Sequence, residues 1–370
     1  MQHFNRRGVL KLATAAVAMP AIIGRASPVS AQTAFKDESL IVVSWSGNYE
    51  LTFRDTVIAG FNAKYGTKAE TVGGWDQMVP QIKAAPADNP PFDLIVADEY
   101  TALTGLAENM FLETDRSKIP GFAEIYPWFD ENRPAFKNYG VPFGGGTLWM
   151  LLAKSTGLDP HSWKSLWDEK AQGKITLDSV VFGWNLCIPA ILSDRMPGIE
   201  EVYGTPEEME PLFLELEKLK AARWYKDGAE LANLLFQEEA AVAMAYSTDV
   251  YDFITKHSDD FAAAVPKEGS ATYVDWYAKV RGTKHAELAE LFQAYLLEQE
   301  TQQLFLNSSS SFMSRKDLVA PAHFADYPKS NEDYHRMFNV FTMDGWSKFV
   351  THWDALDARM KQTIIKTTQG

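Results

Sequence analysis

Residues 39–45 are Ser-Leu-Ile-Val-Val-Ser-Trp, an apolar run rich in β-branched side chains that is typical of a buried strand. The turn residues 46–48 end it, and residues 49–65 then carry apolar side chains at roughly helical spacing. The next predicted elements are a strand, a helix and a buried strand, over 68–72, 78–84 and 92–97. This alternation of strands and helices predicts an α/β fold on a parallel sheet, with ligands at the carboxyl ends of its strands.

A glycine-rich segment interrupts the alternation. Residues 139–147 are Tyr-Gly-Val-Pro-Phe-Gly-Gly-Gly-Thr, and the next strand is predicted directly after them, over 148–153. A phosphate-binding loop is not indicated, because no Lys-Ser/Thr pair follows and the Gly-x-Gly-x-x-Gly spacing is absent. We therefore expect a bend or a crossover between two parts of the fold. Further along, residues 205–208 (Thr-Pro-Glu-Glu) predict a helix start, and residues 283–306 carry another helical pattern.

The first thirty-one residues have the pattern of an export signal. Residues 5–11 (Asn-Arg-Arg-Gly-Val-Leu-Lys) are close to the twin-arginine motif, an apolar stretch covers 12–23, and residues 29–31 (Val-Ser-Ala) fit the small-x-small cleavage rule. The alternatives are a Sec signal or an N-terminal anchor, although 12–23 is short against the about 20 apolar residues of a membrane span. Cleavage near Ala31 would remove four basic residues and no acidic ones, which takes the formal charge from −14 to −18. We expect an exported, soluble protein of the periplasm.

Composition narrows the possible functions. The chain has 370 residues, enough for two domains, and its 46% hydrophobic content is that of a globular protein. With 49 acidic against 35 basic residues, it lacks the basic character that a nucleic-acid partner requires. The single cysteine, Cys187, excludes an internal disulfide and a multi-cysteine metal site.

Catalytic patterns are also missing from the sequence. The seven histidines form no His-x-x-x-His pair, there is no Gly-x-Ser-x-Gly, and Cys187 lies in an apolar stretch without a basic neighbour. We therefore expect a binding protein without cofactor or metal rather than an enzyme.

Several short motifs together resemble the periplasmic solute-binding proteins of ABC importers, specifically the spermidine/putrescine-binding group. The resemblance extends over essentially the whole mature chain. The segments that carry it are Ser44-Trp45-Ser46, Asp93-Leu94-Ile95-Val96 with Tyr100, Val141-Pro142-Phe143, Ser162-Trp163-Lys164-Ser165-Leu166-Trp167, Gly173-Lys174-Ile175, Thr176-Leu177-Asp178, the run from Glu239 to Tyr246, and Tyr273-Val274-Asp275.

The resemblance implies a two-lobed periplasmic-binding-protein fold of α/β class with a ligand cleft between the lobes. One lobe would hold residues 36–143 and 275–318, and the other residues 144–274 and 319–370. The partners would be a small-molecule ligand and the membrane permease of an ABC importer, with no nucleic acid, and the protein would be a monomer. Closure of the lobes on the ligand would be the signal to the permease.

The resemblance also implies a pocket of aromatic rings and carboxylates, because rings attract ammonium groups and carboxylates accept their N–H donors. Carried over by position, the ligand-binding residues are Trp45, Ser46, Tyr100, Asp178, Tyr246, Tyr273 and Asp275, followed by Trp184, Trp276 and Arg223. Strand alternation allows only one of Tyr273 and Trp276 to share a face with Asp275, and we favour Tyr273. Gly47 and Val181 stand where the spermidine binder has acids, although Glu99 or Asp249 could add charge.

Three functions stay open on the sequence. The first is capture of a small organic cation, such as putrescine or another polyamine-like amine. The second is the same transport role with a zwitterion such as an ω-amino acid or betaine, whose carboxylate would be received by Arg223, Arg281 or Ser46. The third, an exported enzyme on the same fold, is disfavoured by the missing catalytic patterns.

Overall fold

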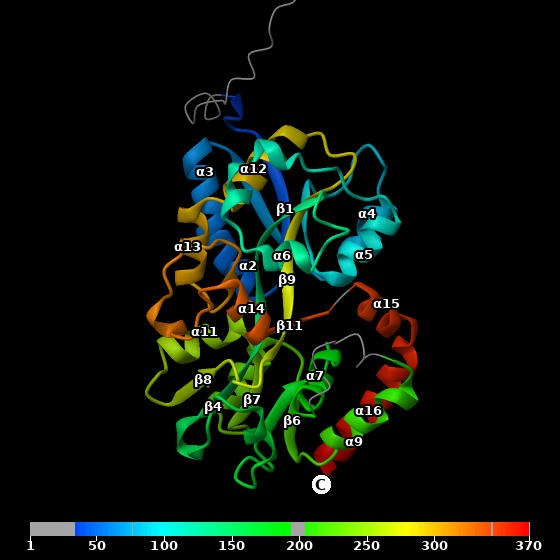
Figure 1. Cartoon of the computed structure of the whole chain (residues 1–370), viewed down its shortest axis with the longest axis vertical. Helices are drawn as coiled ribbons and strands as arrows, with labels where there is room; N and C mark the ends of the chain where they lie inside the picture. The colour runs from blue at the N-terminus through cyan, green and yellow to red at the C-terminus, as the bar shows by residue number, and fades with distance from the viewer. Residues whose placement is uncertain (1–33, 76, 194–203, 342, 370) are drawn as a thin grey trace, which may run out of the picture.

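The computed structural model describes residues 34–75, 77–193, 204–341 and 343–369. The predicted export signal, residues 1–31, lies outside the described residues. The chain forms two α/β lobes, one above the other in Figure 1, and the predicted fold class is confirmed. Among the residues that the structure describes, none of the helices combines the length and the apolar character that a membrane crossing needs.

The upper lobe is built around three parallel strands at the positions predicted from the sequence. β1 pairs with β2 from Ser39↔Lys68 to Trp45↔Gly74 and with β3 at Val42↔Leu94, so the three strands run in the same direction. The predicted helix over 49–65 is present, but a π-helical turn divides it. The elements of this lobe are β1 (Ser39–Trp45), α2 (Asn48–Phe53), η1 (Arg54–Ile58), α3 (Ala59–Tyr65), β2 (Lys68–Gly74), α4 (Met78–Ala84), β3 (Leu94–Ala97), α5 (Glu99–Ala107), η2 (Arg116–Lys118), η3 (Pro120–Glu124), α6 (Pro127–Glu131), α12 (Ala286–Leu296) and α13 (Gln299–Asn307).

Two long strands, β4 (Gly140–Ala153) and β9 (Ser270–Lys279), join the lobes. β9 pairs antiparallel with β3 and with the first half of β4, whereas the second half of β4 pairs with β7 (Val242–Tyr246) and β8 (Phe261–Ala264) in the lower lobe. In Figure 1, β9 runs from one lobe to the other. The two strands are therefore the backbone connection about which the lobes could move.

The glycines of β4 lie where the strand passes from one lobe to the other, as the expected crossover requires, and its pairing with β9 shifts register between Pro142 and Gly144. They do not end a strand, so the strand predicted over 148–153 begins earlier, at Gly140. A side chain on Gly144 would meet the backbone of β10 (Phe312–Met313), and one on Gly145 would meet the backbone of Tyr273 in β9. These glycines let both neighbouring strands lie close to β4, so the strand continues through them.

The lower lobe has a second parallel group, in which β5 pairs with β6 and with β7. The predicted helix start at Thr205 is confirmed as a capping box, since Thr205 and Glu208 each accept the other's backbone N–H. The remaining elements here are η4 (Lys154–Thr156), η5 (Trp163–Trp167), β5 (Ile175–Asp178), α7 (Gly183–Leu192), α9 (Pro206–Leu216), β6 (Ala221–Tyr225), α10 (Gly228–Phe236), α11 (Ser247–Thr255) and α16 (Trp353–Gln369).

The chain segment that precedes α16 contacts both lobes. β11 (Phe338–Val340) pairs with β9, and α14 (Asn331–Met337) packs on α6 of the upper lobe, with the Tyr334 ring 5.1 Å from that of Trp128. α15 (Met343–Thr351) lies against α5, and η6 (Ala322–Phe324) precedes this segment. The assignment of residues to moving lobes concerns motion and stays a prediction.

Candidate functional site

A buried carboxylate on β9, Asp275, lies near the end of β1, from which it is separated in the sheet by β3. The Trp45 indole Nε1 donates to Asp275 Oδ1 at 2.7 Å, and the two residues are 6% and 1% exposed. The other oxygen, Oδ2, accepts no hydrogen bond of ordinary geometry within the described residues, although the Tyr49 hydroxyl is near enough to the carboxylate to favour its ionised form. Burial raises the pKa of Asp275 to about 7, even though the Trp45 and Tyr49 side chains favour the ionised form. An oxygen in this state is suited to accept a hydrogen bond from a cation.

Aromatic rings from three elements gather around Tyr273, a neighbour of this carboxylate on β9. Tyr273 lies two residues before Asp275 on β9 and so shares its face of the strand. Its ring passes over Gly146, where a side chain would collide with the phenol. The Tyr273 ring lies 6.3 Å from that of Tyr246 on β7 and 6.1 Å from that of Trp184 on α7. Gly146 therefore supplies the room that Tyr273 needs to reach the other two rings.

The second carboxylate, Asp178 at the end of β5, is already hydrogen-bonded. Its Oδ1 accepts from the backbone N–H groups of Val180 (2.7 Å) and Val181 (3.2 Å), and its Oδ2 accepts from the Tyr246 hydroxyl at 2.5 Å. Burial raises the pKa of Asp178 against these hydrogen bonds. Asp178 thus holds the Tyr246 ring in place and has less capacity left for a ligand than Asp275.

Two further acids that could add charge have different surroundings. Asp249 on α11 accepts from Asn48 Nδ2 on α2 at 3.0 Å, which links the two lobes, and burial together with Asp178 raises its pKa to about 6. Glu99 is fully buried and forms an ion pair with the fully buried Arg133. Burial lowers the pKa of Arg133 to about 9, and its Nη1 also donates to the carbonyl of Asn132. The charge of Glu99 is therefore balanced inside the upper lobe.

The structure adds one aromatic residue that the sequence reasoning missed. Trp75 follows directly after β2, and its ring stacks on Trp45 with centroids 5.4 Å apart and an interplanar angle of 28°. Trp75 is 48% exposed. The signal that could have found it is its position, because it follows a predicted parallel strand at the edge where ligands are expected.

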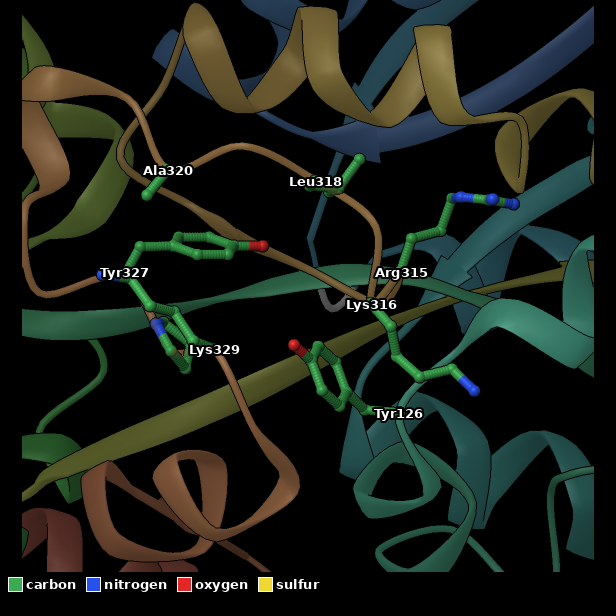
Figure 2. Close-up of a pocket in the computed structure, with 8 residues that line it drawn as sticks. Tyr126, Arg315, Lys316, Leu318, Ala320, Tyr327 and Lys329 are labelled. Atoms are coloured by element: carbon green, nitrogen blue, oxygen red, sulfur yellow. The ribbon is translucent and has the colours of Figure 1, made fainter.

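Two cavities of the described structure hold none of the predicted ligand-binding residues. One, of about 130 Å³, is lined by Tyr126, Arg315, Lys316, Leu318, Ala320, Tyr327, Pro328 and Lys329. Figure 2 shows the hydroxyls of Tyr126 and Tyr327 pointing into it, whereas the charged ends of Arg315 and Lys316 lead away. A groove of about 550 Å³ lies on the upper lobe along β2 and α4. No cluster of three or more metal-ligating side chains occurs in the described ranges of the chain.

Comparison with known proteins establishes the family. The family described as "bacterial extracellular solute-binding protein" matches residues 56–332. The chain belongs to this family. It is therefore an extracytoplasmic solute-binding protein of the kind that serves ABC transporters, and the predicted relationship to the spermidine/putrescine-type proteins is confirmed.

The relatives of this solute-binding protein are named for two different kinds of ligand. It is 24% identical over 293 residues to a gamma-aminobutyric acid-binding protein of Pseudomonas aeruginosa, covering 77% of this chain and 78% of the relative. It is 25% identical over 214 residues to spermidine/putrescine-binding periplasmic protein 1 of Haemophilus influenzae, covering 57% and 58%. A spermidine/putrescine ABC transporter substrate-binding protein of Streptococcus pneumoniae has the same fold, with a TM-score of 0.68 at 18% identity over 90% and 100% of the chains.

Several residues predicted for the site of this solute-binding protein lie apart from the cluster. Trp276 is fully buried in the upper lobe, with its ring 5.9 Å edge-on to Phe136, because strand alternation turns it away from Asp275. Arg223 on β6 is exposed and forms an ion pair with Glu239 at 3.5 Å. Arg281 donates to the backbone carbonyls of residues 109 and 111.

Ser46 and Tyr100 lie at the expected edge of the sheet. Ser46 follows β1, Tyr100 is in the first turn of α5 directly after β3, and both are half-buried. Six of the ten predicted residues thus form two groups that are linked through β9: Trp45 with Asp275, and Tyr273 with Tyr246, Trp184 and Asp178. Ser46 and Tyr100 lie at the edge of the sheet, and Trp276 and Arg223 lie apart from both groups. Contact with a ligand stays a prediction for all of them.

Proposed function

We propose that this solute-binding protein captures a small organic amine between its lobes and delivers it to the permease of an ABC importer. The observation that carries the proposal is Asp275: a buried carboxylate without a cationic partner in the described residues, with one oxygen held by Trp45 and the other accepting no hydrogen bond of ordinary geometry. Burial of an unpaired charge costs several kcal/mol, so the ionised form needs a cation. An alkylammonium group provides both the charge and the N–H donors.

The rings around Asp275 fit the rest of such a ligand. Trp45, Tyr273 and Tyr246 offer faces on which methylene groups can pack, and a ring face attracts an ammonium group by about 0.5–2 kcal/mol. The phenols stay neutral at physiological pH, because burial raises the pKa of Tyr273 and of Tyr246 far above the usual value. A neutral phenol can still donate a hydrogen bond to the carboxylates, as Tyr246 does to Asp178.

Delivery requires movement, because Asp275 and Trp45 have almost no exposed surface. A rotation of the lobes about β4 and β9 would expose them, and ligand binding would favour the closed arrangement. The Asn48–Asp249 hydrogen bond joins the lobes and would break if they separated. This cycle uses no catalytic group, and we assign no enzymatic activity to the protein.

A diamine such as putrescine is our first candidate ligand. Asp178 and Asp275 give the pocket two carboxylates, while Gly47 and Val181 add none. Two ammonium groups would equal these charges in number, one of them paired directly with Asp275, whereas spermidine would bring a third positive charge into a closed site.

An ω-amino acid such as γ-aminobutyrate is the second candidate, and one observation favours it. Both oxygens of Asp178 already accept hydrogen bonds, so Asp275 alone has an unoccupied oxygen for an ammonium group. A ligand with one ammonium group satisfies that arrangement. The relative named as a gamma-aminobutyric acid-binding protein also covers more of this chain than the one named for spermidine and putrescine.

Calorimetric titration of the purified protein with putrescine, spermidine, γ-aminobutyrate and betaine tests the proposal. We expect putrescine to bind at least tenfold more tightly than spermidine, a difference of about 1.4 kcal/mol. Spermidine binding equally well would contradict the charge count. Binding of γ-aminobutyrate alone would establish the second candidate, and binding of none of the four would refute the amine proposal.

We also propose that the mature protein is a periplasmic monomer produced by cleavage near Ala31. Mass spectrometry of the exported protein should give a chain that begins near residue 32. Size-exclusion chromatography with light scattering should give the mass of one chain, and a concentration-independent dimer would contradict the monomer.

A further inference from the structure

Trp75 is placed against the binding site by the two glycines before it. A side chain on Gly73 would meet the carboxylate of Glu50 and the hydroxyl of Ser46, and one on Gly74 would meet Val43 and Met78. The end of β2 can therefore approach β1 and α2 only because both positions are glycine. Gly74 is the register partner of Trp45, so the next residue lies directly beside the Trp45 ring.

The two indoles differ in how firmly they are held. Trp45 is almost fully buried and its Nε1 is bonded to Asp275. Trp75 stacks on Trp45 yet is 48% exposed, so stacking covers one part of its ring and leaves another part open. Exposure increases in the order Asp275 (1%), Trp45 (6%), Trp75 (48%), so this row of contacting side chains extends from the buried carboxylate to the surface.

The surroundings of Trp75 suit a positive group. Because a side chain on Gly73 would meet the Glu50 carboxylate, that carboxylate reaches over the end of β2, two residues from Trp75. An indole face is the ring that attracts cations best, and an opposite charge nearby adds to the attraction.

We infer that Trp75 is a specificity-determining residue that binds the end of the ligand farther from Asp275, and that it gives the protein a preference for amines with a second cationic group. The inference rests on the proposed function, in which the first ammonium group occupies Asp275. A ligand extended from Asp275 along Trp45 reaches Trp75 next, and a second ammonium group at that point would lie over the exposed part of the indole. A monoamine of equal length would bring only a methyl group there.

The affinities for putrescine and butylamine distinguish the contributions of the two ends of the ligand, since both compounds have a four-carbon chain and an ammonium group at one end. We would titrate both into the wild type, Trp75→Leu and Trp75→Phe by calorimetry. Leucine keeps an apolar side chain but has no ring, whereas phenylalanine keeps a ring. Trp75→Leu should weaken putrescine binding about threefold to thirtyfold and leave butylamine binding nearly unchanged. Trp75→Phe should keep most of the preference for putrescine.

Phe236→Leu is the matched control. Phe236 is 50% exposed and stacks on Phe253 at 5.1 Å in the lower lobe, so it has the exposure and stacking of Trp75 without the nearby site. This variant should leave both affinities unchanged.

The outcomes distinguish this inference from the proposed function. Wild-type protein that binds neither amine contradicts the diamine form of the proposed function and, with it, the premise of the inference. Wild-type protein that binds both amines equally, or a Trp75→Leu variant that keeps the putrescine preference or weakens both amines to the same extent, overturns the inference alone.

Discussion

Replacing Asp275 with asparagine should stabilise the unliganded protein and weaken ligand binding at the same time. Asparagine keeps an oxygen for the Trp45 indole but removes the buried charge. The unfolded carboxyl group ionises near pH 3.8, whereas the folded one ionises near pH 7. Between these values the folded protein binds more protons at this group than the unfolded protein does. The contribution of Asp275 to the free energy of unfolding therefore falls as the pH rises and is constant above about pH 7.

The structure gives the size of the effect. The interval from pH 3.8 to about 7 corresponds to about 4 kcal/mol of lost stability for a group as buried as Asp275. The asparagine amide would leave a buried donor where Oδ2 has no partner, which costs about 1–3 kcal/mol. We therefore expect Asp275→Asn to be more stable than the wild type by about 1–3 kcal/mol at pH 8 and no more stable at pH 5. Affinity for putrescine should fall by about 2–5 kcal/mol, the cost of losing one partner of a buried charge pair.

Urea unfolding at pH 5 and pH 8, with calorimetric titration of putrescine, measures both effects. Asp93→Asn is the control, since Asp93 is also buried but its oxygens accept from the Ile41 N–H and the Thr283 hydroxyl. That variant should be destabilised at pH 8. If Asp275→Asn has the same pH dependence of stability as the wild type, the Asp275 carboxylate is not the desolvated group that the structure indicates, and the reasoning fails.

Three further predictions concern the same site. Affinity for putrescine should rise up to about tenfold per pH unit between pH 5 and 7 and level off above, because Asp275 must release its proton to pair with an ammonium group; a flat profile in calorimetry would contradict that pairing. Gly146→Ala should displace the Tyr273 ring, lowering the free energy of unfolding by about 1–3 kcal/mol in urea titrations and weakening binding; unchanged values would show that the ring is not confined. Asn48→Ala removes the hydrogen bond to Asp249 and should weaken putrescine binding by about 0.5–1.5 kcal/mol and enlarge the radius of gyration in X-ray scattering; identical scattering would show that this bond does not favour closure.

Local patterns in the sequence were sufficient for the first elements of the upper lobe, up to β3, whereas the helical pattern predicted over 283–306 is divided in the structure into α12 and α13. The strand at 39–45 has the predicted bounds, and the helix predicted over 49–65 differs only by its π-helical turn. Both depend on contacts between residues near in sequence. The continuous strand β4 was not predicted, because glycine weakens a strand. The glycines are accommodated here because the backbone of residues 273 and 312 lies close to β4.

Prediction of the site residues was likewise limited to what local sequence patterns determine. Strand alternation placed Tyr273 on the face of Asp275 and the structure turns Trp276 into the core, so a two-residue period was enough for that choice. Arg223 was proposed for its charge, but its ion pair with Glu239 depends on how β6 lies in the folded chain. Trp75 follows two glycines and belongs to no periodic pattern, so its contact with Trp45 becomes visible only when β1 and β2 are paired.

The position of β9 between β3 and β4 has a consequence for synthesis of the chain. β3 pairs with β1 on one side and with β9 on the other, and the partner of Ala97 is Trp276, about 180 residues later. At ribosomal rates of about 5–20 residues per second, roughly 10–40 s pass before that partner is made. During this time the fully buried residues of β3 would present an unpaired strand edge, which is a template for aggregation. A nascent chain of this protein should therefore bind chaperones until β9 emerges, and ribosome-bound chains that end before residue 270 should be more sensitive to protease than chains that end after 300.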